Sequence, residues 1–212
     1  TVRIFNELEV DELAFHDITA SKTRSDPNYS VLKDVANECF MPLSYGGGID
    51  NLDKAKRIYD IGFEKIILNT HALKNPGLIT EIANIFGSQA IIASVDYKKN
   101  LFGKKIVMSH SGTKKTEFLP NEWCKQLQDL GAGEILLTSI DKEGTWEGFD
   151  KETISAVSDQ LKIPVIANGG CGSVEDIEDL LLNTNVSAVA LGSILVFQKK
   201  GMGVLVNFPD RK

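Results

Sequence analysis

Short, almost uninterrupted apolar runs alternate along the chain with segments that are apolar on one helical face only. Strands of a parallel sheet are buried on both faces, so they appear as such continuous apolar runs. The alternation predicts a parallel α/β sheet, either closed into a barrel or open and doubly wound. The seven predicted strands are Glu12–Ile18, Met41–Tyr45, Lys65–Asn69, Ala90–Asp96, Glu134–Ile140, Ile163–Ala167 and Ser187–Leu191.

The segments between these runs carry helical signals. Leu52, Ala55 and Ile58 share one face of a helix. Asp26-Pro27 indicates the start of another helix, because proline is favoured at the first helical position. The apolar residues before Leu13 indicate a first helix. The polar segment 109–117 is either a lid or the solvated tip of a hairpin.

The second half of the chain repeats the first after a shift of 122 residues. Under this shift Glu12 aligns with Glu134 (12 + 122 = 134), and Gly47-Gly48 align with Gly169-Gly170. Three strands of each half coincide without a gap. The repeat predicts two half-barrels, residues 1–87 and 88–212, within one domain that spans residues 1–212.

The strand Ala90–Asp96 precedes the second half but has no counterpart before the first, because 96 − 122 = −26. Seven parallel strands leave two open edges, which invite aggregation. We therefore expect a (β/α)8 TIM barrel built from two half-barrel repeats, with its first strand and following loop missing from a sequence that begins at Thr1. The alternative is a true seven-stranded protein.

Composition limits the partners. The net charge of 23 − 29 = −6 argues against nucleic acid. No apolar run approaches the about 20 residues that a membrane helix needs, so we expect neither nucleic acid nor membrane as a partner. Three widely spaced cysteines fit a reducing cytoplasm better than a disulfide scaffold. His16, His71 and His110 lack the spacing of metal ligands, so no metal or cofactor is predicted.

Glycine clusters follow two strands that are related by the repeat. Gly46–Gly48 and Gly169-Gly170 each stand between a strand and a helix, where backbone amides and the helix N-terminus attract anions. Asn69-Thr70 and Gly192-Ser193 end the next strand of each half. Two such sites predict an elongated ligand with a phosphate at each end. The alternative is that the glycines only permit tight turns.

Acidic residues end several strands. Asp96 closes a strand, which places it at the catalytic face of a barrel and suits general acid–base chemistry. A helix cap or a salt bridge is the alternative. Asp17 and Asp141 close two more strands and can instead hold neighbouring loops together.

Charged residues also open strands, at the opposite end of the predicted barrel. These are Glu12, Lys65 and Glu134. They predict either ordinary surface salt bridges or a ring of charges around the barrel axis.

These residues resemble one family, the cyclase subunit (HisF) of imidazole glycerol phosphate synthase from histidine biosynthesis. The resemblance covers nearly the whole chain, and the motifs that carry it include Asp17–Ser21, Tyr45–Ile49, Ser111-Gly112 and Gly131–Asp141. It implies an ammonia-dependent lyase that acts on a bisphosphorylated ribulosyl-aminoimidazole carboxamide ribotide. It also implies that ammonia comes from a glutaminase subunit at the bottom of the barrel and passes through the barrel to the top.

The resemblance assigns roles residue by residue. Asp96 matches one of two catalytic aspartates, and the other would lie on the missing strand. Glu12, Lys65 and Glu134 match the charged gate for ammonia. The positions that match phosphate and substrate contacts are Asp17, Gly47, Gly48, Asn69, Thr70, Ser111, Gly112, Thr138, Glu143, Gly144, Gly169, Gly170, Gly192 and Ser193.

Some positions depart from the family pattern. Tyr45 stands where a smaller residue is usual, Glu143 replaces an aspartate, Glu117 a glycine and Cys171 an alanine. The segment 204–209 ends the chain without the usual long last helix. These departures favour, as an alternative, a paralogue that amidates a sugar for surface polysaccharide or glycan modification. The residues are also compatible with the sister isomerase of the same pathway and with a non-catalytic scaffold for a glutaminase partner.

Overall fold

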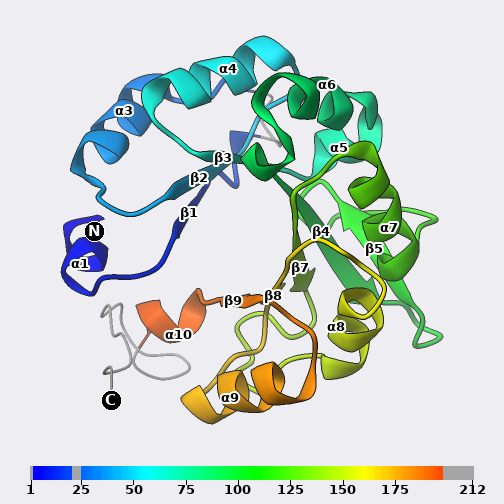
Figure 1. Ribbon diagram of the computed structural model, residues 1–212. Coiled ribbons are helices and arrows are strands. Elements are labelled where there is room, and N and C mark those ends of the chain that lie inside the picture. Colours follow the sequence, from blue (N-terminus) through cyan, green and yellow to red (C-terminus); the bar gives the residue numbers. More distant parts are fainter. Residues whose placement is uncertain (1, 21–24, 198–212) are drawn as a thin grey trace. The chain divides into compact units, whose positions relative to one another are not determined.

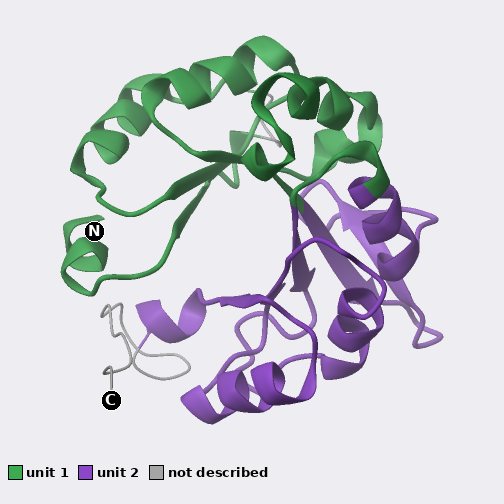
Figure 2. Cartoon of the chain, in the orientation of Figure 1, with its two compact units in different colours: residues 1–93, 129–133 green, residues 94–128, 134–212 purple. Residues whose placement is uncertain are grey.

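The computed structural model describes residues 2–20 and 25–197. Its contacts divide the chain into two compact units (Figure 2). Unit 1 comprises residues 1–93 and 129–133, and unit 2 comprises residues 94–128 and 134–212. The boundary falls inside a strand, slightly beyond the repeat boundary predicted at 87/88. Ser21 of the family motif and the segment 204–209 lie outside the described residues.

Unit 1 alternates parallel strands with helices (Figure 1). The strands pair in the order β1-β2-β3-β4, all parallel, and β4 contributes its first residues. The strands are β1 Leu13–His16, β2 Leu43–Gly46, β3 Lys65–Leu68 and β4 Ile91–Lys99. The helices are α1 Val2–Glu7, α3 Tyr29–Glu38, α4 Leu52–Ile61, α5 Thr70–Lys74 and α6 Gly77–Phe86, with a 3-10 turn η1 at Ser88–Ala90.

Unit 2 continues β4 and adds an antiparallel hairpin before it returns to parallel strands. The hairpin consists of β5 Lys105–Ser109 and β6 Lys114–Lys115. The strands follow in the order β4-β7-β8-β9, with β7 Glu134–Ser139, β8 Val165–Asn168 and β9 Ala188–Ala190, and β7–β8 and β8–β9 are parallel. The helices are α7 Pro120–Leu130, α8 Lys151–Ser158, α9 Val174–Asn183 and α10 Ser193–Val196.

All seven predicted strands are confirmed, and the pairs β1–β2, β2–β3, β3–β4, β7–β8 and β8–β9 are parallel as expected. This regular alternation of parallel strands and helices is that of the (β/α)8-barrel class. The segment 109–117 belongs to a hairpin with backbone pairing, β5 to β6, rather than to an open lid.

One predicted helix start is wrong. Helix α3 begins at Tyr29, and Asn28 is its N-cap, with Oδ1 accepting from the Val31 N–H at 3.3 Å. The Asp26 carboxylate instead binds Lys54 Nζ of α4 at 2.8 Å. The helix therefore starts beyond the Asp26-Pro27 signal, with Asn28 as its capping residue.

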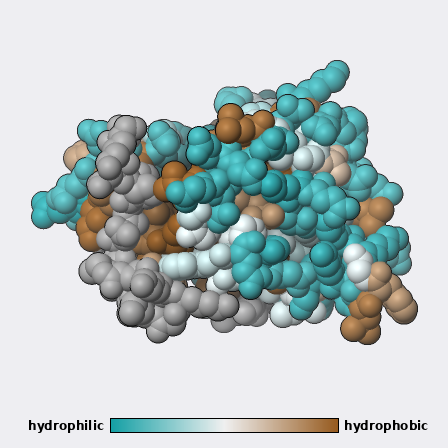
Figure 3. Space-filling model, turned by 90° about the horizontal axis from the view of Figure 1, so that it is seen from below, coloured by the Kyte–Doolittle hydropathy of each residue, from teal (hydrophilic) through white to brown (hydrophobic). Residues whose placement is uncertain are grey.

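The apolar side chains of the strands and helices form the cores of the two units. In unit 1 the predicted helix face is confirmed, since Ala55 and Ile58 are fully buried. In unit 2 the strand residue Ile135 and the helix residues Leu127 and Val157 are fully buried. Hydrophilic side chains predominate on the face shown in Figure 3, and hydrophobic ones form small separate groups there.

The internal repeat is visible in the strand registers. Leu13 pairs with Leu43 in unit 1, and Ile135 pairs with Val165 in unit 2, so both strands keep the offset of 122 (13 + 122 = 135; 43 + 122 = 165). Helices α4 and α9 keep the same offset at both ends (52 + 122 = 174; 61 + 122 = 183).

The third strand of each unit breaks this offset. Ser44 pairs with Lys65, whereas its mate Ile166 pairs with Ala188, and 188 − 65 = 123. The gapless repeat predicted from the sequence is therefore wrong by one residue here. The connection between helix and strand spans residues 62–64 in unit 1 and residues 184–187 in unit 2, so the extra residue lies in that connection.

Candidate active site

The turn after β2 in unit 1 requires glycine. Gly47 and Gly48 have φ angles of 146° and 64°, which lie in the region that side chains rarely adopt. A methyl group on Gly47 would lie 2.7 Å from Asp17 Cβ, and one on Gly48 would lie 2.8 Å from the Ser25 carbonyl oxygen. The backbone of this turn therefore passes close to its neighbours with no space for side chains of its own.

Asp17 organises the loop that follows β1. Its N–H donates to the Gly46 carbonyl at 2.7 Å. Its Oδ1 accepts from the Thr19 N–H at 3.0 Å, the Thr19 hydroxyl at 2.8 Å and the Ala20 N–H at 3.0 Å. Partial burial acts to raise the pKa of Asp17, but the hydrogen bonds from Thr19 and Ala20 outweigh it and lower that pKa. The geometry fits the loop-holding alternative for Asp17.

The corresponding turn of unit 2 follows β8. Gly169 and Gly170 have φ angles of 96° and 106°. A methyl group on Gly169 would lie 2.7 Å from the Ser139 carbonyl oxygen, and one on Gly170 would lie 2.3 Å from the Gly148 carbonyl oxygen. The Gly148 N–H donates to the Gly170 carbonyl at 2.8 Å. Both glycine turns therefore pass close to a neighbouring loop of their own unit.

The helices that follow the two glycine turns start in the same way. Asn51 caps α4 with φ −155° and ψ 167°, and its side chain accepts from the Lys54 N–H at 2.9 Å. Ser173 caps α9 with φ −155° and ψ 169°, and it forms a capping box with Asp176. The N-cap residues of the two helices therefore share one backbone conformation, whereas the preceding glycines differ in φ by 50° (146° against 96°) and by 42° (64° against 106°).

The next pair of turns also matches, with the offset of 123. Asn69 precedes α5 with φ −123° and ψ −86°, and Gly192 precedes α10 with φ −117° and ψ −84°. Thr70, which is 5% exposed, begins α5, and Ser193 begins α10. Each unit thus presents a glycine turn and a second polar turn built on the same plan.

Three further predicted contacts, Thr138, Glu143 and Gly144, belong to unit 2. The Thr138 hydroxyl on β7 accepts from Asn168 Nδ2 at 3.2 Å. Glu143 Oε1 lies 3.7 Å from the position that a methyl group on Gly192 would occupy. Although much of the Glu143 side chain reaches solvent, the surrounding protein raises its pKa by desolvation. Gly144 has a φ of 71° and open space around it.

The sequence did not indicate Trp146 as a site residue. Its indole reaches the second polar turn of unit 2, at Ser193. Trp146 Nε1 donates to Ser193 Oγ at 3.2 Å. The only local signal is that Gly144 and Gly148 flank Trp146, which indicates an unusual loop but not its contact.

Asp96 lies on β4, in the part of that strand that belongs to unit 2. The Ser94 hydroxyl donates to Asp96 Oδ1 at 3.4 Å, and the Asp96 backbone is opposite Met108 of β5. Ser111 and Gly112 lie in the β5–β6 turn with φ angles of 54° and 77°. The same antiparallel pair of strands therefore positions the candidate acid–base residue and this turn.

Two of the predicted gate residues, Glu12 and Lys65, belong to unit 1 and meet there. Lys65, the first residue of β3, binds Glu12 Oε2 through Nζ at 2.8 Å. Their side chains are 18% and 32% exposed, so solvent partly screens this pair. Glu134 is the first residue of β7 in unit 2.

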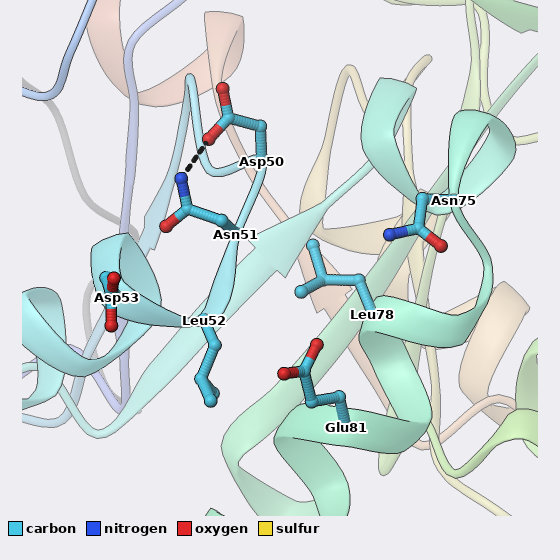
Figure 4. Close-up of a pocket in the computed structure, with 7 residues that line it drawn as sticks. All are labelled: Asp50, Asn51, Leu52, Asp53, Asn75, Leu78 and Glu81. Atoms are coloured by element: carbon cyan, nitrogen blue, oxygen red, sulfur yellow. Dashed lines mark hydrogen bonds between the residues drawn. The ribbon is translucent and has the colours of Figure 1, made fainter.

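A cleft in unit 1 does not involve the predicted site residues. It has a volume of about 320 Å³ and is lined by Asp50, Asn51, Leu52, Asp53, Asn75, Leu78 and Glu81 (Figure 4). Its three carboxylates make it unsuitable for a phosphate. Among residues 2–20 and 25–197, no group of three or more His, Cys, Asp or Glu is placed to hold a metal ion. None of the helices in those ranges is long and apolar enough to cross a membrane.

Comparison with known proteins decides the family. The family model described as "Histidine biosynthesis protein" matches residues 1–200. The chain belongs to this family. Similar members include a Pseudomonas aeruginosa protein with the provisional name imidazole glycerol phosphate synthase subunit hisF2, which is 46% identical over 209 residues, covering 99% of this chain and 83% of the relative.

Further members of the histidine biosynthesis family agree. A Leptospira borgpetersenii protein, provisionally named imidazole glycerol phosphate synthase subunit HisF, is 45% identical over 210 residues, covering 99% of this chain and 83% of the relative. The protein named imidazole glycerol phosphate synthase subunit HisF in Chlorobium phaeovibrioides is 44% identical over 198 residues, covering 93% of this chain and 78% of the relative.

The departures at Tyr45 and Cys171 have a local explanation. Tyr45 is fully buried, with its ring 6.3 Å from the Phe15 ring and 5.9 Å from the Phe63 ring. Burial, followed by the nearby Asp17 charge, raises the pKa of Tyr45. Cys171 is buried with its thiol directed to the Ser173 carbonyl at 3.4 Å, so it is a packing residue of the α9 start.

Proposed function

We propose that the chain is the cyclase subunit of an imidazole glycerol phosphate synthase. In this proposal it uses ammonia from a glutaminase subunit to convert a bisphosphorylated ribulosyl-aminoimidazole carboxamide ribotide. The main support is that each unit holds a glycine turn and a second polar turn in the same order, and that the second turns match in backbone conformation. Two such pairs of turns suit a ligand with two phosphates. The names of the relatives favour the synthase over the sister isomerase.

The proposed roles follow from the residues. Asp96 is the general acid–base group. In unit 1 the backbone at Gly47-Gly48 and Asn69-Thr70 binds one phosphate, and in unit 2 the backbone at Gly144, Gly169-Gly170 and Gly192-Ser193 binds the other. Asp17, Ser111, Gly112, Thr138 and Glu143 shape the substrate site. Glu12, Lys65 and Glu134 form the gate for ammonia, on the side where the glutaminase docks.

A second candidate function is the amidation of a sugar for surface polysaccharide or glycan modification. Its support is the set of positions at which the chain departs from the family pattern, which are Tyr45, Glu117, Glu143 and Cys171. The Glu143 carboxyl lies beside Gly192, next to the turn proposed to bind a phosphate. Glutamate in place of aspartate keeps a carboxyl at this position but lengthens its side chain by one methylene group, which changes the shape of the site beside this turn.

The test uses the purified full-length gene product with the bisphosphorylated ribotide and excess ammonium salt, without a glutaminase. The expected result is consumption of the ribotide. Asp96→Asn should lower turnover by ~10²–10⁴-fold with the fold intact, since acid–base groups typically contribute that much. Asp60→Asn, on the exposed side of α4, is the matched control and should keep full activity.

The outcomes separate the candidates. An Asp96→Asn activity within tenfold of wild type would contradict the role of that residue. No turnover by a folded wild-type protein would contradict the cyclase proposal. Nucleotide sugars would then be tested as substrates, and activity on none of them would favour the scaffold alternative.

A further inference from the structure

Trp146 links the β7–α8 loop of unit 2 to the start of α10. Its indole Nε1–H donates to Ser193 Oγ at 3.2 Å. An indole N–H is a donor only, whereas a serine hydroxyl has one hydrogen to donate and two lone pairs that accept. In this contact Ser193 is therefore the acceptor, and its own hydroxyl hydrogen remains to donate elsewhere.

The loop holds Trp146 in an unusual conformation. Its φ angle is 62°, in the left-handed region that bulky residues rarely adopt unless the surrounding structure imposes it. A methyl group on Gly172 would lie 2.5 Å from the Trp146 carbonyl oxygen and 3.0 Å from its Cβ. The Gly148–Gly170 backbone bond of 2.8 Å closes the same loop onto the glycine turn. The glycine turn and the Trp146 loop therefore fix one another.

We propose that Trp146 is a positioning residue for the unit 2 phosphate turn. By occupying a lone pair of Ser193 Oγ, its N–H orients the Ser193 hydroxyl so that the hydroxyl donates to a phosphate oxygen held by Gly169-Gly170 and Gly192. This inference rests on the proposed function, in which that turn binds a phosphate. It assigns to Trp146 an effect on binding through Ser193 and no direct part in the chemistry.

The chain is well suited to a direct test because it has two tryptophans. The other, Trp123, is buried in α7, with its ring 4.7 Å from that of Phe118. In a Trp123→Phe variant Trp146 is the only indole. We expect titration with inorganic phosphate to change its fluorescence in a saturable way, with an affinity that calorimetry finds unchanged from wild type.

A double-mutant cycle then tests the coupling. We expect Trp146→Phe, which keeps an aromatic ring but removes the N–H, to weaken one class of phosphate sites by about 5- to 10-fold in calorimetry, as for loss of one hydrogen bond. In a Ser193→Ala background the same change should cost less than about twofold, because the partner is already absent. With substrate, Trp146→Phe should raise KM more than it lowers kcat.

Four outcomes would overturn the inference. Two concern Trp146 itself: an unchanged phosphate affinity in folded Trp146→Phe, or losses of affinity in Trp146→Phe and Ser193→Ala that simply add in the double variant. The other two are an equal loss of phosphate affinity in Trp123→Phe and an absence of phosphate binding by the wild type. Failure of the cyclase proposal looks different. In that case the ribotide is not consumed, while phosphate binding and its coupling between Trp146 and Ser193 are retained.

Discussion

Single glycines differ sharply in how much the structure depends on them, and Gly170 is the clearest case. We expect Gly170→Ala to lower the free energy of unfolding by about 2–4 kcal/mol, because a left-handed φ and a backbone clash add together. Its methyl group would lie 2.3 Å from the Gly148 carbonyl oxygen. Gly144→Ala is the control, with φ 71° and nothing within 4 Å of the added methyl, and should cost only about 1 kcal/mol.

Urea denaturation of the two glycine variants measures this difference. Equal losses for Gly170→Ala and Gly144→Ala would show that the close approach to Gly148 is relieved by a small backbone shift. The Trp146 contact would then also change, because Gly170 and Gly148 share the backbone bond that closes that loop.

At the scale of elements, Asp150 holds the start of α8 against two strands of unit 2. Its carboxylate accepts from Lys105 Nζ of β5 at 3.0 Å, the Tyr97 hydroxyl of β4 at 3.0 Å and the Thr153 hydroxyl of α8 at 2.8 Å. The Asp150 and Lys105 side chains are only 14% and 15% exposed. Removal of Asp150 therefore takes away the acceptor that these three groups share, while Lys105 keeps its ion pair with Glu152 at 2.8 Å.

We predict that Asp150→Ala lowers the free energy of unfolding by about 2–4 kcal/mol, as expected when a largely buried pair is broken. Asp179→Ala is the control, since Asp179 binds Lys151 in a pair whose side chains are about half exposed, and it should have little effect. A loss for Asp150→Ala no larger than for Asp179→Ala, in thermal or urea unfolding, would contradict this assignment.

The same carboxylate predicts a pH dependence. Partial burial acts to raise the pKa of Asp150, but the bonds from Lys105, Thr153 and Tyr97 outweigh it and hold the pKa below the ordinary value of 3.8. Its stabilising contribution is thus complete above that ordinary value and is lost as the pH falls through the folded-state pKa. The stability difference between wild type and Asp150→Ala should therefore be constant near neutral pH and shrink only in strong acid.

The elements were largely predictable, and the exceptions have physical causes. The strands could be predicted because burial on both faces leaves a continuous apolar run, such as Ile91–Val95. The start of α3 was placed too early, because Asn28 caps this helix while Asp26 binds Lys54 of another helix. The contacts of Trp146 and Asp150 join segments far apart in the sequence and follow no periodicity. The change of the repeat offset from 122 to 123 could not be found by matching identical residues between the two halves. It is visible only in the strand register, where Ile166 pairs with Ala188.

At the scale of the whole molecule, the proposed entry of ammonia can be tested at the ion pair between Glu12 and Lys65. We predict that Lys65→Ala lowers glutamine-dependent activity, measured with the glutaminase subunit, at least several-fold more than activity with added ammonium salt. The reason is that ammonia delivered by the glutaminase has to pass the proposed gate, whereas added ammonium salt supplies ammonia directly from solution. Lys33→Ala, on the exposed side of α3, is the control. Equal losses in both assays would contradict the gate assignment.

The extra residue between α9 and β9 has a consequence for the history and engineering of the two halves. Segments exchanged between them up to the ends of α4 and α9 can be cut at positions 122 apart, whereas segments that include the third strand must be cut at positions 123 apart. A chimera built with the offset of 122 throughout would align Thr70 with Gly192 instead of Ser193. It would also shift the register of the third strand by one residue, which turns its side chains to the opposite face of the sheet. The connection at residues 184–187 is thus where the two halves have diverged in length, while the turns before α5 and α10 have kept one backbone conformation.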